Sequence, residues 1–196
     1  MLIDINILAW LVWVFPLLGA GVSILLSRIG GPIRDYAVVI FSLLGAIMAA
    51  LMLPELGAAE AYESMAFWIS LPDGGYVGVG MLVDPLSIIL ANMVAFLGFI
   101  IMLYSVRYME HEPGKNRYWF FMSLFIASML LLVMADNLIL LFIGWKMVGV
   151  CSYALIGHYY TDEEEYWVGG PSPLPFRKPS RAGLKALLVT TFGDVA

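Results

Sequence analysis

Residues 140–160 read LLFIGWKMVGVCSYALIGHYY, an apolar run with one full charge, Lys146. An α-helix needs about 20 mostly apolar residues to cross the roughly 30 Å hydrocarbon layer of a bilayer. Only helices and closed barrels satisfy all of their backbone hydrogen bonds in that layer. The stretch therefore predicts a membrane-spanning helix, and Lys146 is the residue of that helix that needs a physical explanation.

The whole chain is similarly apolar. Of its 196 residues, 62% are hydrophobic and 13% are charged, whereas soluble domains carry about 25% charged residues. Five segments are long and apolar enough to span a membrane. They cover residues 7–26, 36–53, 86–105, 118–134 and 138–157. We therefore predict an all-α integral membrane protein with at least five transmembrane helices.

The basic residues fall on alternate loops between these spans. Arg28 and Arg34 lie in the first predicted loop, and the third and fifth loops hold the rest apart from Lys146. Those others are Arg107, Lys115, Arg117, Arg177, Lys178, Arg181 and Lys185. By the positive-inside rule these loops face the cytoplasm. We therefore expect a multi-pass protein of the bilayer with its amino terminus outside.

The remaining segments complete the predicted organisation. The sequence AFWISLPDGGYVGVGML places two β-prone runs around a Pro-Asp-Gly-Gly turn, which predicts a small β-hairpin on the outer face. A sixth apolar segment begins near Gly183 and covers only roughly 20 Å before Ala196, too short to cross, so we expect a truncated or longer protein. The predicted division is 1–53 (two helices), 54–85 (outer loop with hairpin), 86–160 (helices three to five), 161–182 (inner Pro-rich loop) and 183–196 (start of helix six).

Several classes of function have no support in the residues. No loop carries a basic patch with interleaved aromatic residues, so we expect no nucleic-acid partner. There is no Cys/His cluster, nucleophile elbow or Walker loop, and His111 and His158 are too isolated to bind a metal. The single cysteine, Cys151, is expected to be a packing residue. We therefore predict neither a metal site nor a soluble catalytic site.

Polar residues at the outer ends of the spans are expected to be structural. Asp136 or Asn137, in the short turn before the fifth span, can cap that helix. Asp84 precedes Pro85 at the start of the third span, which favours a helix-start residue over a member of a proton relay.

Lys146 is expected to lie deep in the bilayer, about 12 Å from the outer end of its helix and roughly 16 Å from the inner end. Its stem reaches only about 6 Å, and insertion scales give a cost of about 2.5–3.5 kcal/mol for such a charge. Phe142, Gly149, Tyr153 and Gly157 share its helix face. The small residues on that face admit another helix or water, so we expect the face to point into a bundle.

Asp194, in the sixth segment, is the predicted partner of Lys146. If that helix enters the membrane from the inside near residues 184–186, Asp194 reaches a depth of about 12–15 Å, close to that of the lysine. A separation above about 8 Å would contradict the pair, since one bridging water spans less. A desolvated lysine loses its proton more easily, which suits a proton relay. The alternative is a lysine that is ion-paired for assembly or merely tolerated.

Four segments carry a resemblance to a known family. They are LVDPLSIIL, YSVRYMEHEPGKNRYWFFMSLFIASMLLLVMADNLILLFIGW, VGVCSYALIGHYY and KALLVTTFGDV. There the sequence resembles the antiporter-like L subunit of respiratory complex I, the NADH-quinone oxidoreductase. It is also similar to the A subunit of Mrp-type Na+/H+ antiporters and to the L-type subunit of methanogen deazaflavin dehydrogenases. The resemblance covers residues 82–196, and the first two spans match in pattern only.

The resemblance implies the amino-terminal portion of a membrane-arm subunit in a redox-driven proton pump of a prokaryotic cell membrane. Such a subunit holds no cofactor, and the redox chemistry of the translocase belongs to partner subunits. The candidate proton-translocating residues are Lys146, Asp194 and His158. The alternatives are a subunit of a multisubunit Na+/H+ antiporter and a non-pumping structural fragment of the membrane arm.

Two positions depart from the family pattern. The family has a glutamate in a GWE motif where this chain has Gly144-Trp145-Lys146, which reverses the sign of the charge. Thr191 stands where bacterial relatives tend to have arginine, whereas Asp194 matches the family aspartate. Without that neighbouring cation, Asp194 is more plausibly paired with Lys146.

Overall fold

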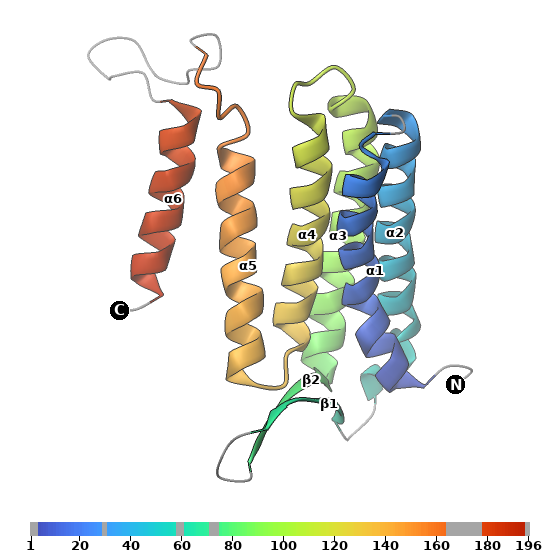
Figure 1. Ribbon diagram of the computed structural model, residues 1–196. Coiled ribbons are helices and arrows are strands. Elements are labelled where there is room, and N and C mark those ends of the chain that lie inside the picture. Colours follow the sequence, from blue (N-terminus) through green and yellow to red (C-terminus); the bar gives the residue numbers. More distant parts are fainter. Residues whose placement is uncertain (1–3, 29–30, 58–60, 71–74, 164–177, 195–196) are drawn as a thin grey trace.

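A computed structural model describes residues 4–28, 31–57, 61–70, 75–163 and 178–194, which form a helical protein with one small sheet (Figure 1). The elements are α1 (Ile5–Leu26), α2 (Gly31–Leu51), the 3-10 helix η1 (Leu53–Gly57), β1 (Tyr62–Ser70), β2 (Tyr76–Val83), α3 (Pro85–Tyr108), α4 (Lys115–Met134), α5 (Leu138–Ile156) and α6 (Pro179–Gly193). Helices α1 to α5 are each long and apolar enough to cross a membrane. The predicted fold class and its five spans are therefore confirmed.

Several helices are longer than the apolar runs that predicted them. Arg34 lies in α2, Arg107 in α3, Lys115 and Arg117 in α4, and Lys185 in α6, so the expectation that these residues lie in loops is wrong. A helix can continue beyond the hydrocarbon layer wherever water or polar partners receive its charged side chains. The loop between α3 and α4, next to Arg107 and Lys115, lies at the end of the molecule opposite the sheet (Figure 1).

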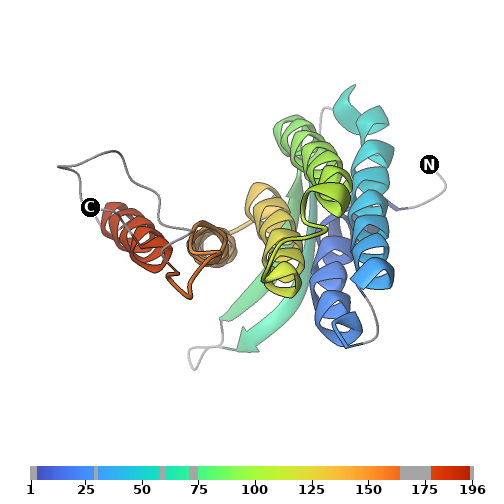
Figure 2. The same cartoon turned by 90° about the horizontal axis from the view of Figure 1, so that it is seen from above.

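The helices form a bundle with a two-helix extension. Helix α1 packs against α2 and α4, and α3 packs against the same two helices. Helix α5 lies on the far side of α4, and α6 lies beyond α5, as the view along the bundle shows (Figure 2). We call α5 and α6 together the wing. Because the principal contacts of α6 are with α5 alone, the wing has much less covered surface than the bundle.

The apolar core lies mainly in the bundle, and α5 of the wing adds Leu140 to it. Leu8, Met52, Met81, Trp119 and Met134 are each fully buried there. In α6 the buried residues are only Pro179 and Gly183, while α1 and α4 each bury a continuous face. Helix α6 is thus held by close contact at its start and by polar groups further along.

The two strands form the predicted hairpin on the end of the bundle at which α1 begins (Figure 1). They pair antiparallel, with Tyr62 opposite Val83 and a register irregularity between Phe67 and Ile69. The side-chain amide of Asn137 donates to the carbonyl of Gly78 at 3.1 Å, which joins the hairpin to the turn before α5. The predicted Pro-Asp-Gly-Gly turn, and residues 164–177 of the predicted Pro-rich inner loop, lie outside the described residues.

The polar residues at the starts of α3 and α5 have the structural roles predicted for them. The carboxylate of Asp84 accepts a hydrogen bond from the backbone N–H of Ser87 at 2.6 Å, as part of a capping box at the start of α3. Asn137 accepts from the N–H of Leu140 at 2.9 Å and caps α5. These contacts satisfy helix N–H groups that have no partner within the helix.

Candidate proton-transfer site

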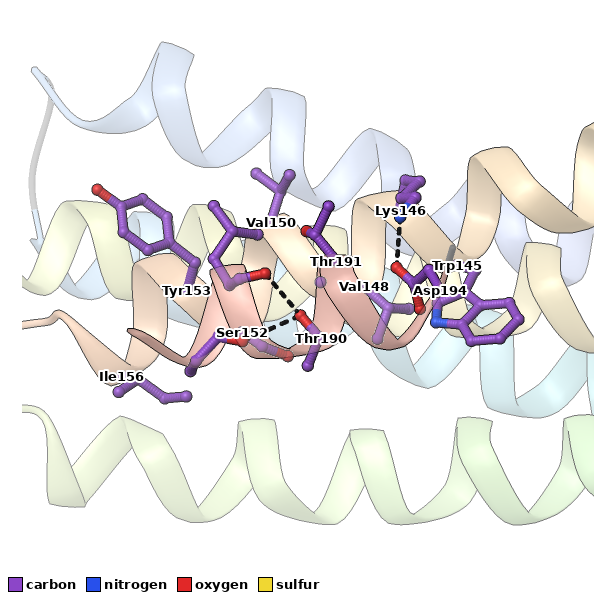
Figure 3. Close-up of a pocket in the computed structure, with 13 residues that line it drawn as sticks. Trp145, Lys146, Val148, Val150, Ser152, Tyr153, Ile156, Thr190, Thr191 and Asp194 are labelled. Carbon is purple, nitrogen blue, oxygen red and sulfur yellow. Dashed lines mark hydrogen bonds and ion pairs between the residues drawn. The ribbon is translucent and has the colours of Figure 1, made fainter. Parts of the chain in front are cut away.

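Lys146 and Asp194 form an ion pair across the wing, with the ammonium Nζ donating to the carboxylate Oδ2 (Figure 3). The predicted pair is thereby confirmed. The Asp194 side chain is 10% exposed and the Lys146 side chain 32% exposed. Two charges that are largely removed from water stabilise each other only when they are close and hydrogen-bonded. The pair therefore provides the compensation that a lysine at this depth of an apolar helix requires.

The pair closes one end of a groove between α5 and α6. The groove holds about 360 Å³ and is bordered mainly by apolar side chains, among them Trp145, Val148, Ile156 and Leu187. Hydroxyl groups of Ser152, Thr190 and Thr191 also border it, and Figure 3 shows the labelled side chains arranged along the two helices. An ion pair at the end of a mostly apolar groove is weakly screened, so a change in its protonation has a large electrostatic consequence.

The Phe142 ring also lies close to the ammonium. Lys146 Nζ is 5.1 Å from the centre of that ring, within the range of a cation–π contact. Phe142 is one helical turn before Lys146, as the predicted shared face requires. The ring contributes attraction without accepting a proton, so Asp194 is the acidic group that faces Lys146 among the described residues.

Two glycines set the distance between α5 and α6. A Cβ added to Gly183 would lie 2.8 Å from the carbonyl oxygen of Tyr153 and 3.2 Å from the nitrogen of Gly157. Backbone atoms cannot yield to such a contact as a flexible side chain can, so only glycine fits at position 183 without moving a helix. Because of this close contact α6 packs along α5. Asp194, eleven positions after Gly183, therefore lies beside Lys146.

A second contact fixes the start of α6. The Asp162 carboxylate accepts hydrogen bonds from the backbone N–H of Ser180 at 3.0 Å and from its hydroxyl at 2.5 Å. The hydroxyl bond and then the N–H bond, with help from Lys178 and Arg181, lower the pKa of Asp162. Asp162 itself has a positive φ of 56°, a conformation that Asp adopts more readily than most residues. This contact anchors the first turn of the helix that carries Asp194.

His158, the third predicted site residue, lies apart from the ion pair. It follows the end of α5, twelve positions or about 18 Å of helix from Lys146. Its Nε2 lies 2.8 Å from the carbonyl oxygen of Pro113, and its ring lies edge-on to that of Tyr118. The histidine thus joins the loop after α5 to the loop before α4. Its role in proton translocation stays a prediction.

The structure also contains a charged cluster that the sequence analysis did not find. Arg34 and Asp35 have side chains only 3% exposed, with the guanidinium Nη2 2.6 Å from the carboxylate. Lys115 Nζ approaches the other oxygen of the same carboxylate at 2.6 Å, and Asn116 accepts from Arg34 Nη1. We call these four residues the inner cluster. The signal in the sequence is the pair of adjacent opposite charges at positions 34 and 35, but the prediction that Arg34 lies in a loop gives no reason to expect their burial.

Among the described residues, no group of three His, Cys, Asp or Glu side chains is placed to hold a metal ion. Cys151 is buried and in thiol form within α5, as a packing residue would be. The Lys146–Asp194 pair brings together an ammonium and a carboxylate, two groups between which a proton can be exchanged.

Comparison with known proteins identifies relatives of the chain. Residues 68–119 match the family model described as NADH-Ubiquinone oxidoreductase (complex I), chain 5 N-terminus. The chain is 41% identical over 128 residues to the NADH-quinone oxidoreductase subunit L of Escherichia coli (strain K12), covering 65% of this chain and 18% of that protein. It spans only 18–24% of the length of the first curated relatives that it matches.

Two solved structures share the arrangement of the helices. A chain of the membrane-bound sulfane sulfur reductase (MBS), an archaeal respiratory membrane complex, superposes with a TM-score of 0.74 at 18% identity, over 94% of this chain and 34% of that chain. A chain of the Mrp complex from Dietzia sp. DQ12-45-1b gives a TM-score of 0.65 at 25% identity, over 97% of this chain and 18% of that chain. The fold thus occurs in multisubunit membrane complexes.

Proposed function

We propose that this chain is an antiporter-like subunit in the membrane arm of a redox-driven proton pump. The proposal rests on the similarity of the chain to the amino-terminal part of the L-type, or chain 5, subunits of complex I. The relatives are named as subunits of larger assemblies, and the wing of this chain presents weakly covered helices. Both observations support other membrane subunits as its partners. In this proposal electron transfer takes place in those partners, and this chain contributes to moving protons.

The observation that carries the proposal is the Lys146–Asp194 pair at the end of the groove. In the paired state the ammonium donates a hydrogen bond to the carboxylate, and both groups are charged. A proton that reaches Asp194 neutralises the carboxylate and removes the partner of the ammonium. A weakly solvated ammonium without a partner is destabilised, so Lys146 can release its proton onward. Transfer of the Asp194 proton to Lys146 then restores the ion pair with zero net charge.

A change in the charge of position 146 tests this proposal. We expect Lys146→Glu and Lys146→Ala, in the assembled complex reconstituted into vesicles, to lower the number of protons translocated per electron pair. Lys185→Ala is a matched control, because Lys185 lies on the same wing but is exposed and does not line the groove. Normal assembly with an unchanged ratio in both Lys146 variants would instead favour a non-pumping structural part of the membrane arm.

A second candidate function is cation/proton exchange, which the likeness to a chain of the Mrp complex supports. The two candidates differ in their source of energy. An exchanger should move protons when a sodium gradient alone is imposed on vesicles, without any electron donor. A pump subunit should move protons only while electrons are being transferred.

The proposed orientation places the amino terminus outside and the end with Arg107 and Lys115 in the cytoplasm, in the plasma membrane of a prokaryote. The concentration of basic residues at that end supports it. A reporter that is active only outside the membrane, fused to the amino terminus, tests it, and activity of the same reporter in the α3–α4 loop would overturn it.

A further inference from the structure

A second cavity lies at the opposite side of the bundle from the groove, at the ends of α2, α3 and α4. It holds about 280 Å³ and is open on one side. Its lining residues come from the start of α2, the end of α3 with the turn after it, and the start of α4: Pro32, Asp35, Tyr36, Val106, Arg107, Glu110 and Lys115. We call it the inner-end cavity. The proton-transfer site shares none of these residues.

The inner-end cavity presents equal numbers of acidic and basic groups. Lys115 is paired with Asp35 at 2.6 Å, and Arg107 is paired with Glu110. Asp35 is also paired with the buried Arg34. These contacts fix the positions of Asp35 and Lys115, which form one half of the cavity. Arg107 and Glu110 form the more exposed half, with side chains 86% and 41% exposed. A ligand that carries both charges therefore meets a complementary partner for each.

The position of the cavity corresponds to the headgroup layer of a membrane. Helix α3 has 24 residues and a length of about 36 Å, several ångströms more than the hydrocarbon thickness. Its last turn therefore emerges among the lipid headgroups. Tyr104 and Tyr108 stack on this turn with ring centres 5.5 Å apart and are both exposed, as is Tyr36. Exposed tyrosines at a helix end are typical of the interfacial layer.

We propose that the inner-end cavity binds the zwitterionic headgroup of an aminophospholipid, such as phosphatidylethanolamine. The phosphate is received by Arg107 and by the remaining N–H groups of Lys115, and the primary ammonium is received by Glu110 with the Tyr36 ring beside it. A purely anionic headgroup would meet two carboxylates with no positive group to offer them. The trimethylated amine of phosphatidylcholine has no N–H to donate to Glu110. The inference is independent of the proposed proton transfer.

Photo-crosslinking tests this proposal on the protein in its native complex. The complex is reconstituted into vesicles that contain a photoreactive analogue of phosphatidylethanolamine, phosphatidylglycerol or phosphatidylcholine, and adducts are mapped to residues 104–117. We expect the ethanolamine lipid to dominate, and the double variant Arg107→Gln, Glu110→Gln to lower that adduct about tenfold, as the loss of a charged hydrogen bond implies. Both residues are exposed, so the variant should assemble normally.

Arg28→Gln is the matched control, since Arg28 is exposed on the turn after α1 and does not line the cavity. It should leave the adduct unchanged. The proposal is overturned if the glycerol or choline lipid reacts as strongly as the ethanolamine lipid. It is also overturned if the double variant retains the wild-type adduct, or if no lipid adduct maps to residues 104–117.

Discussion

The Lys146–Asp194 pair allows the structural and transport roles of one contact to be separated. In Lys146→Met the ammonium is removed and the Asp194 carboxylate, only 10% exposed, loses its partner. Breaking a fully buried pair in this way costs about 3–5 kcal/mol. Because the Lys146 side chain is 32% exposed, water screens part of the interaction, and we expect a loss of about 2 kcal/mol in the free energy of unfolding.

The double variant Lys146→Met, Asp194→Leu should behave differently. Both charges are then replaced by apolar side chains of similar volume, in a groove whose border is already mostly apolar. Such replacements are often neutral or stabilising, because neither charge has to be desolvated. We therefore expect the double variant to recover most of the stability lost in Lys146→Met, while the number of protons translocated per electron pair stays lowered in both.

Two measurements on the same preparations decide the outcome. Thermal unfolding of the detergent-solubilised complex reports stability, and the acidification of vesicles per electron pair reports translocation. Lys185→Met, an exposed cation on α6, controls for the simple loss of a positive charge from the wing. Recovery of translocation together with stability in the double variant would refute the reasoning, since the pair would then serve assembly alone.

Three further substitutions test how the site is positioned. Gly183→Ala forces a contact with backbone atoms of α5 and should lower the free energy of unfolding by about 1–3 kcal/mol. Gly193→Ala has open space around it and should leave the free energy of unfolding unchanged. Equal effects of the two substitutions in thermal unfolding would contradict the close crossing. Asn137→Ala removes the α5 cap and should lower the free energy of unfolding by about 1 kcal/mol. Asn137→Asp should keep the cap but lose the amide donor to the hairpin. Faster hydrogen exchange in the strands would report that loss. Because the pKa of Asp162 is lowered by its bonds from Ser180, its stabilisation is complete well above the ordinary value of about 3.9 and is lost as the pH falls below it. Asp162→Asn should therefore flatten the decline of the melting temperature between about pH 5 and pH 3, and an unchanged slope would count against the anchor.

The predicted spans and the ion pair were accessible from the sequence for different reasons. Apolar length is a one-dimensional property, so the spans could be counted without knowing how they pack. The pairing of Lys146 with Asp194 required only that two helices enter from known sides, because a rise of 1.5 Å per residue then fixes the depth of each residue. Neither argument required a tertiary contact to be known in advance.

The inner cluster was not predictable by the same arguments. Arg34 and Lys115 are 81 positions apart in the chain, and each stands at a helix end where exposure to water is the usual outcome. Their burial depends on α2 and α4 starting side by side around Asp35, which is a property of bundle packing. The helix ends were misplaced for the same reason, since a charged residue was assumed to end a span even where a partner on another helix receives it.

The two charged clusters differ in how completely their groups are covered, and under the proposed function this difference separates a structural contact from one that exchanges protons. In the inner cluster one carboxylate is shared by Arg34 and Lys115, and the side chains of Arg34 and Asp35 are 3% exposed. Loss of the Asp35 charge would leave two cations facing each other without a shared anion. In the wing, Asp194 faces one ammonium beside an open groove, so the proposed proton transfer involves a single partner cation.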